Sequence, residues 1–357
     1  MIPLVLPAQA EPGVPYVTRL GRDAGVRNQA QLIEESVNSA IFAGDHGLVE
    51  IEGVPANDLD GDVVLVDPDA GRVERLFRSG SNHNTLLVTE RCDQLCVMCS
   101  QPPKKTHVDR FALLEQACRL ADESALIGIS GGEPTLYKNE LFELIENVLR
   151  NRPDLRFHVL SNAQHFTDDD IDRLRQPLWG KVAWGIPLYA ADPKLHDEIV
   201  GKSGAADALE AGLARLIMAG ARIELRTVVV QQNVAILSTL ARFVSTNLQP
   251  IEQWSIMQLE HIGFARGRWA QLYWDHGQDF SSISEAVDLA ELRGIPVRLF
   301  NFPRCTVPAA YRELVVPSIS DWKRQYAQAC DSCTQKAECS GFFAWHPETA
   351  MGGLIPL

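Results

Sequence analysis

The sequence contains no apolar run that approaches the roughly 20 residues needed to cross a membrane. Its start also lacks a basic segment, and proline interrupts the short apolar run there, so we expect no secretory signal peptide. Basic residues are outnumbered, with 33 Lys and Arg against 46 Asp and Glu and a formal net charge of −13. Because phosphate binding requires basic patches, this balance disfavours a nucleic-acid partner. We therefore expect a cytoplasmic protein that does not bind membranes.

The chain divides into three segments by pattern. Its 357 residues suffice for two or three domains, and a hydrophobic fraction of 46% predicts a globular protein. Residues 1–82 contain short apolar runs separated by Asp-Gly and Asp-Pro turn signals. They predict a small, mostly β accessory domain with one helix near residues 28–41. Strand and helix patterns alternate over residues 83–300, and residues 301–357 form a loop-rich, cysteine-containing tail.

The central segment predicts six strands, each followed by a helix. The strands are expected near residues 85–88, 125–130, 156–161, 181–188, 223–230 and 252–258. The helices are expected near residues 109–122, after Pro134, and near residues 167–175, 204–219, 233–247 and 282–293. Such units predict an α/β fold with a parallel sheet, whose ligands bind at the carboxyl ends of the strands. Cys118 lies on the apolar stripe of the first helix and is predicted to be a core thiol.

Three cysteines follow the first predicted strand at a C-x₃-C-x₂-C spacing: Cys92, Cys96 and Cys99. Three thiolates this close can ligate three irons of a cubane cluster and leave the fourth iron open to a substrate or cofactor, which indicates a catalytic cluster. The spacing leaves open a zinc site, with His107 as a further ligand, and buried thiols without a metal. Disulfides would leave one cysteine over and are rare in a reducing compartment.

A second motif, Gly131-Gly132-Glu133-Pro134, directly follows the second predicted strand. Two glycines at a strand end let the backbone approach a ligand and expose its N–H and C=O groups. Such groups, with a nearby carboxylate, suit the ammonium of an amino acid. An ordinary strand-to-helix turn remains the alternative, although the motif falls at the same end of the sheet as the cysteines.

Together these motifs resemble the radical SAM superfamily, which implies a partial (β/α)₆ barrel, a [4Fe–4S] cluster on the three cysteines and S-adenosylmethionine on the open iron. In that family the cluster cleaves the cofactor to a 5′-deoxyadenosyl radical. The resemblance makes Gly131–Pro134 the methionine-binding turn and suggests ribose contacts from Ser161 and Asn162. Met98 stands where the family usually has an aromatic residue, and its thioether can pack on adenine. Arg226 could meet a carboxylate inside the barrel or form a structural ion pair.

The tail holds a second cysteine group: Cys305, Cys330, Cys333 and Cys339. Four cysteines in a loop-rich segment can hold a tetrahedral zinc or all four irons of a cluster, and spacing does not decide between them. The group resembles the shortened SPASM type called Twitch, which follows radical SAM barrels. That resemblance implies a second, auxiliary [4Fe–4S] cluster.

The substrate is suggested by a narrower resemblance. Residues 78–90, 100–103 and 318–322 are similar to the His-Xaa-Ser system radical SAM maturase. This implies a ribosomally made peptide precursor with His-Xaa-Ser repeats, a sister radical SAM maturase and a reducing electron donor. Two alternatives stay open: a radical SAM enzyme acting on a small molecule, nucleotide or glycyl-radical enzyme, and a zinc-stabilised scaffold without activity.

Overall fold

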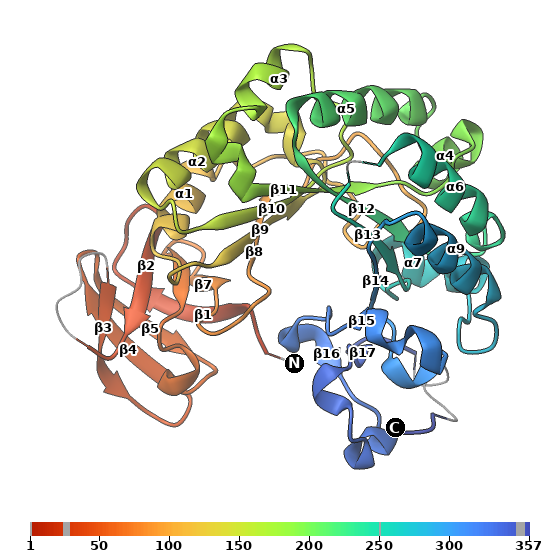
Figure 1. Ribbon diagram of the computed structural model, residues 1–357. Helices are drawn as coiled ribbons and strands as arrows, with labels where there is room; N and C mark the ends of the chain where they lie inside the picture. Colours follow the sequence, from red (N-terminus) through yellow and green to blue (C-terminus); the bar gives the residue numbers. More distant parts are fainter. Residues whose placement is uncertain (1, 24–28, 250, 348–353) are drawn as a thin grey trace.

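The computed structural model describes residues 2–23, 29–249, 251–347 and 354–357. A β-barrel at the N-terminal end adjoins a curved parallel sheet whose outer face is covered by helices (Figure 1). The tail, with short strands and single 3₁₀ turns, lies below the open side of the curve (Figure 1). Within the described residues, no helix has both the length and the apolar character required to cross a membrane.

The N-terminal barrel is closed by seven strands in the order β1-β5-β4-β3-β2-β6-β7. Along β5, Val49 and Ile51 are buried while Leu48 is exposed, the alternation expected of a strand with one face in a core. The predicted β character of this segment is confirmed. The strands are β1 (Val5–Ala10), β2 (Tyr16–Gly21), β3 (Gln29–Glu35), β4 (Ser39–Gly44), β5 (Gly47–Glu52), β6 (Val63–Asp67) and β7 (Arg72–Phe77).

The prediction of a helix near residues 28–41 is wrong. Residue 28 lies outside the described residues, and the rest of the stretch forms β3 and the start of β4, an antiparallel pair. Ala30, Ala40 and Phe42 are buried in the barrel core. Pairing with neighbouring strands on both sides satisfies the backbone there, so tertiary context overrides the helical pattern of the sequence.

The central sheet has eight strands in the order β15-β14-β13-β12-β11-β10-β9-β8, and all pairs are parallel. The predicted α/β fold with a partial barrel is confirmed, and all six expected strands are present. The sheet contains two further strands, β14 and β15. Its strands are β8 (Thr85–Thr89), β9 (Leu126–Gly131), β10 (Arg156–Leu160), β11 (Val182–Pro187), β12 (Arg222–Val228), β13 (Gln253–Met257), β14 (Val297–Phe300) and β15 (Val315–Val316).

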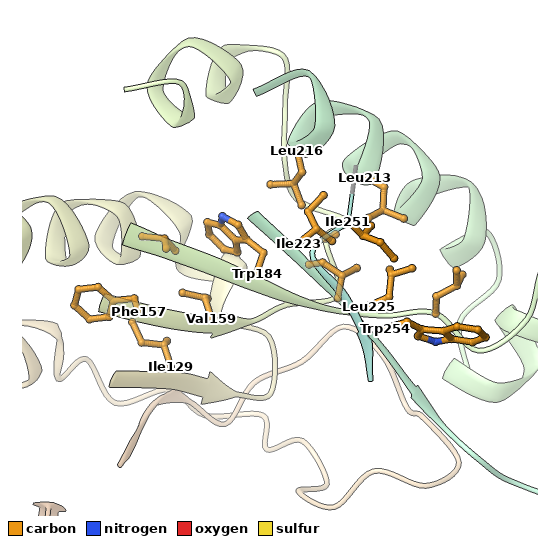
Figure 2. Packing of buried hydrophobic residues seen from close by; sticks show 14 of the residues in the cluster. Ile129, Phe157, Val159, Trp184, Leu213, Leu216, Ile223, Leu225, Ile251 and Trp254 are labelled. Carbon is orange, nitrogen blue, oxygen red and sulfur yellow. The ribbon is translucent and has the colours of Figure 1, made fainter. Parts of the chain in front are cut away.

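The helices pack on the outer face of this sheet. Trp184, Ile223 and Leu225 point from β11 and β12 toward Leu213 and Leu216 of the adjacent helix (Figure 2). Cys118 is fully buried in the same core, as predicted. The helices are α1 (Phe111–Arg119), α2 (Lys138–Asn151), α3 (Asp169–Leu174), α4 (Pro193–Val200), α5 (Ala205–Ala219), α6 (Leu237–Asn247), α7 (Gly263–Gly267), α8 (Trp269–Leu272) and α9 (Ser281–Leu292).

The three regions are joined by side-chain contacts. Arg19 of the barrel donates to Asp122 and to the carbonyl of Leu120, at the end of α1. Across the open side of the curve, Arg78 lies 2.7 Å from Asp321 of the tail. The tail itself pairs β16 (Arg324–Gln325) with β17 (Phe342–Phe343) in antiparallel fashion. The open side of the sheet is therefore bordered by both terminal regions.

Candidate functional site

The cysteine loop, residues 90–100, begins where β8 ends, at the carboxyl edge of the parallel sheet. Its three thiols are half-buried, and the Cys99 amide donates to the Cys96 carbonyl at 3.0 Å. Burial, followed by the neighbouring thiols of Cys99 and Cys92, raises the pKa of Cys96 to about 12. The three sulfurs are thus close enough to interact electrostatically. Because metals bind thiolates, iron binding here would release protons.

The first glycine that shapes the loop is Gly132. A Cβ at this position would lie 2.2 Å from the Arg91 carbonyl oxygen and 2.9 Å from Cys92 Cβ, so only glycine permits the approach. The following amide, of Glu133, donates to the Arg91 carbonyl at 2.8 Å. The Gly-Gly turn is therefore in direct contact with the residue before the first cysteine.

Two further glycines contact the loop from other elements. A Cβ on Gly201, just after α4, would lie 2.6 Å from the Leu95 carbonyl oxygen. A Cβ on Gly263, at the start of α7, would lie 2.2 Å from the Cys99 carbonyl oxygen. We call Gly132, Gly201 and Gly263 the loop-contacting glycines. The backbone of each glycine packs closely against a carbonyl group beside or within the cysteine motif.

Helix α4 holds the middle of the loop by backbone bonds. The Leu95 amide donates to the Val200 carbonyl at 3.0 Å, and the Val97 amide donates to the Ile199 carbonyl at 2.8 Å. Met98 is buried in an apolar cluster that includes Ile199 and Val200. The thioether thus packs against the protein on at least one side. The helices expected above do not include α4, although its Pro193 start and Gly201 end are helix signals.

Glu133 is buried, and its carboxylate accepts four hydrogen bonds. They come from the Thr135 amide and hydroxyl, the Ser161 hydroxyl at 2.8 Å and the Asn162 amide at 2.6 Å. The Glu133 carboxylate therefore fixes the turn to the end of β10. Within the described residues its oxygens already have donors, so the exposed backbone of the turn is the part available to an amino-acid ligand.

Ser161 and Asn162 lie at the end of β10, beside the turn and the cysteine loop. The Ser161 hydroxyl donates to Glu133 and accepts from the Ala163 amide. The Asn162 side-chain amide donates to Asp93 at 2.9 Å. Both side chains thus connect the end of this strand to the residues around Cys92.

Asp93 is the centre of a polar network that the sequence analysis did not find. Lys202 Nζ lies 2.5 Å from one carboxylate oxygen of Asp93 and donates to Gln164 at 2.7 Å. His165 Nε2 lies 3.3 Å from the same oxygen. Burial raises the pKa of Asp93, but the hydrogen bonds and charges of His165 and Lys202 outweigh burial and hold it well below its usual range. Only the position of Asp93 next to Cys92 hinted at its involvement.

Arg226 lies on the inner face of the sheet and is paired. Its Nη1 lies 3.0 Å from both carboxylate oxygens of Glu224 on the same strand. His158 Nε2 lies 2.6 Å from Glu224, and Ser255 donates to it. Burial raises the pKa of Glu224, but Arg226 and then His158 lower it to about 2. This arrangement is the structural ion pair that was one of two alternatives for Arg226.

The four tail cysteines line one cavity. Two backbone amides point at Cys339 Sγ, that of Arg304 at 3.3 Å and that of Gly341 at 3.4 Å. Burial raises the pKa of Cys305 to about 11, and the thiols of Cys339, Cys330 and Cys333 contribute to the rise. The four sulfurs therefore face one another around a shared space.

Residues 86–243 match the family model of the radical SAM superfamily. This part of the chain is a radical SAM domain. The matched stretch contains the cysteine loop, the Gly-Gly turn and the polar network around Asp93. No curated protein matches the sequence significantly.

Solved structures with a similar fold include SuiB of Streptococcus suis bound to S-adenosylmethionine, at 16% identity over 60% of this chain and 49% of that one, with a TM-score of 0.49. SuiB bound to its precursor peptide SuiA gives 17% identity, coverages of 60% and 48% and a TM-score of 0.48. A radical SAM methyltransferase of Sphaerobacter thermophilus gives 15% identity, 76% coverage of both chains and a TM-score of 0.45. The enzyme spans about half the length of SuiB, and at these identities the likeness concerns the fold alone.

The donor sets of the enzyme suit iron–sulfur clusters and S-adenosylmethionine. Thiolates are the ligands that these clusters use, and the glycines of the turn leave backbone groups open to a ligand. In the described part of the chain, no three His, Cys, Asp or Glu side chains converge on a point that could hold a single metal ion. A cubane carries its thiolates on separate irons and needs a wider spacing than one ion does.

Proposed function

We propose that the enzyme uses S-adenosylmethionine to modify a ribosomally made peptide, a precursor with His-Xaa-Ser repeats. The observation that carries the radical chemistry is the meeting of three half-buried thiols and the Gly-Gly turn at the carboxyl edge of the sheet. Ligands of parallel α/β sheets bind at that edge. The cofactor contacts and the peptide substrate are parts of the same proposal.

Cys92, Cys96 and Cys99 would hold the catalytic [4Fe–4S] cluster. The backbone at Gly131 and Gly132 would bind the amino group of the cofactor's methionine, with the buried Glu133 holding the turn in place. When bound, the cluster supplies one electron that splits the sulfonium to give a 5′-deoxyadenosyl radical. The protein's own contribution is to position the cofactor and to exclude water around it.

In the tail, Cys305, Cys330, Cys333 and Cys339 would hold a second [4Fe–4S] cluster. Amide N–H groups that point at a cysteine sulfur, as at Cys339, are a common way to tune such a cluster. A reducing electron donor is needed to start each turnover. We place the reaction in the cytoplasm, where thiols stay reduced.

Two segments that resemble the His-Xaa-Ser maturase meet in space. Arg78, at the start of residues 78–90, forms its ion pair with Asp321 of residues 318–322, although 243 positions separate them. The contact links the segment after the barrel to the tail. The acidic balance of the chain, −13, suits a neutral or basic peptide rich in histidine.

The test is co-expression of a His-Xaa-Ser precursor with the enzyme and the sister maturase, followed by mass spectrometry of the repeat region. We expect a mass change from a crosslink or another hydrogen-abstraction product. The matched control replaces Cys92, Cys96 and Cys99 by alanine, which should abolish both the change and 5′-deoxyadenosine formation. An unchanged precursor despite active cofactor cleavage would refute the peptide proposal and favour a small-molecule substrate.

A further inference from the structure

A second cavity lies between the carboxyl ends of β13 and β14 and the tail. Its walls come from the segment after β13, the loop after β14 and the strand β17. Leu259 and Tyr273, which line it, also belong to or pack on the apolar cluster around Met98. Thr306, on the other side, is next to Cys305. The cavity therefore lies between the two cysteine groups.

Two polar side chains in this cavity are deeply buried, and each has one atom without a partner. Gln258 is 5% exposed and His276 is 4% exposed. Gln258 Oε1 and His276 Nδ1 have no hydrogen-bond partner among the described residues. Gln258 uses its amide instead, donating to the Trp274 carbonyl at 3.4 Å. An unpaired buried polar atom costs free energy, so each such atom requires an explanation.

The neighbouring contacts determine which ring nitrogen of His276 carries the proton. Thr306 donates its only hydroxyl proton to the Pro303 carbonyl, at 2.7 Å. The 2.7 Å contact between His276 Nε2 and the Thr306 hydroxyl must then be donated by the histidine. Burial lowers the pKa of His276 to about 4, so the ring is neutral at pH 7. Its Nδ1 is therefore a lone-pair acceptor.

A carboxylate also lines the cavity. Asp275 is exposed, and its two oxygens accept from the Gly277 amide and the Gln278 side-chain amide. Asn301 donates to the Gln258 carbonyl and accepts from Ser318, so its side chain is paired. Phe302 meets the His276 ring edge to face at 4.6 Å and fixes its plane. The two buried atoms without a partner, Gln258 Oε1 and His276 Nδ1, are thus both acceptors, while the wall also carries the Tyr273 hydroxyl and the His346 ring.

We propose that this cavity is a binding subsite for a substrate group that donates N–H hydrogen bonds, such as a primary amide or a guanidinium. Gln258 Oε1 and His276 Nδ1 each accept one N–H, and Asp275 favours donors at the entrance. A group without N–H donors would leave both acceptors unpaired. The assignment of the occupant as part of a peptide rests on the proposed function, whereas the donor requirement rests on the cavity alone.

The test uses small probes with the cluster-loaded, full-length enzyme, labelled with ¹⁵N-histidine. His276 is assigned by loss of its signals in the His276→Gln variant. The enzyme is titrated with acetamide, with methylguanidinium and with N,N-dimethylacetamide, which resembles acetamide but has no N–H. We expect an Nε2-protonated His276 whose Nδ1 signal shifts with the two donors and not with dimethylacetamide. Gln258→Met should weaken the acetamide response about fivefold, the effect of one hydrogen bond.

The matched control variant is Gln271→Met, the same change at an exposed position of α8, which should leave the acetamide titration unchanged. An Nδ1-protonated His276, an equal response to dimethylacetamide or no response to any probe would overturn the proposal, the last meaning that the cavity holds only water. No precursor peptide enters this experiment. A failure of the peptide proposal is therefore distinguishable from a failure of the subsite.

Discussion

Three residues without side chains define the backbone path of the cysteine loop. At Gly132 the space for a side chain is taken by the Arg91 carbonyl and Cys92 Cβ, which are not the flexible ends of long side chains. A methyl group there must move the loop or the turn. The residues that define the positions of the three cysteines thus include glycines that are not among the proposed cluster ligands.

We expect Gly132→Ala to lower the unfolding free energy by about 2 kcal/mol, as overpacking does in a tight site. It should also reduce the iron bound at the catalytic site several-fold, because Cys92 is displaced. Thermal unfolding and iron analysis check this. Gly180→Ala is the matched control, since no other described atom lies within 4 Å of a Cβ there. Equal iron content in the two variants would contradict the role given to Gly132.

The free energy of unfolding should depend on pH because the Glu224 carboxylate stabilises the fold only when it is ionised. Its pKa falls from 4.5 to about 2 in the folded enzyme, so its ionised form stabilises the fold above pH 4.5. That contribution, about 3 kcal/mol, is lost as the pH falls toward 2. Glu224→Gln should therefore be less stable than the wild type at pH 6, and the difference should shrink by more than half at pH 3.

Urea unfolding of the cluster-free proteins at the two pH values measures this difference. Glu143→Gln, an exposed position on α2, is the control and should change the unfolding free energy by less than about 0.5 kcal/mol at both. A Glu224→Gln penalty that does not depend on pH would mean that the charge of Glu224 is not what stabilises the inner face of the sheet.

At the scale of elements, α4 acts as a support for the cysteine loop. Two glycines follow it, Gly201 and Gly204, and both have positive φ, 65° and 75°. Only Gly201 approaches the loop, because a Cβ on Gly204 meets no described atom within 4 Å. Alanine variants at the two positions therefore separate two contributions to the loss of stability: the left-handed backbone conformation and the contact with the loop.

Both alanine variants should lose about 1 kcal/mol of stability from the backbone conformation. Gly201→Ala should lose more and should also form 5′-deoxyadenosine several-fold more slowly, because it pushes on the Leu95 carbonyl. Chemical denaturation and a cofactor-cleavage assay provide the two readouts. If Gly204→Ala slows cleavage as much as Gly201→Ala does, the loop contact is not the cause.

Elements with a strong local pattern could be predicted from the sequence. The six strands from β8 to β13 are short apolar runs next to clear helices, and each was expected. The strand β15 has only two residues, so it has no readable pattern, whereas α4 has helix signals at its ends but mixes charged residues with a buried His196. At residues 29–41 the local pattern favoured a helix, and strand pairing within the barrel decided otherwise.

The candidate site likewise contains residues that the sequence reveals and residues that only the fold brings together. Cysteines and glycines in close spacing are visible in the sequence, as are the ends of buried strands. The link between Asp93 and Lys202 joins residues 109 positions apart, and only the fold brings them together. Gly201 and Gly263 have no local signal that ties them to the cysteine loop, since their contacts arise from tertiary packing.

At the scale of the whole molecule, the two cysteine groups belong to different regions and are held by different contacts. The first lies at the edge of the sheet, and the second surrounds a cavity in the tail. Substitutions in one group should therefore leave the other intact. If the two sites are independent, the iron content of each variant depends only on which site it retains.

Reconstituted wild-type enzyme should contain roughly eight irons per chain, and the Cys92, Cys96 and Cys99 to alanine variant roughly four. Iron and sulfide analysis with electron paramagnetic resonance of the reduced protein measures both. A Cys333→Ala variant is the reciprocal control and should lose the tail cluster. About one zinc and no iron in the triple variant would identify the tail as a zinc site instead.

The loop-contacting glycines also have a consequence for the order of events during synthesis. The cysteine loop leaves the ribosome before residues 132, 201 and 263, whose backbones it rests against. The thiols therefore reach their final positions only after most of the sheet has been made. We therefore expect a stable brown colour only from chains in which these residues have been made and the sheet has assembled.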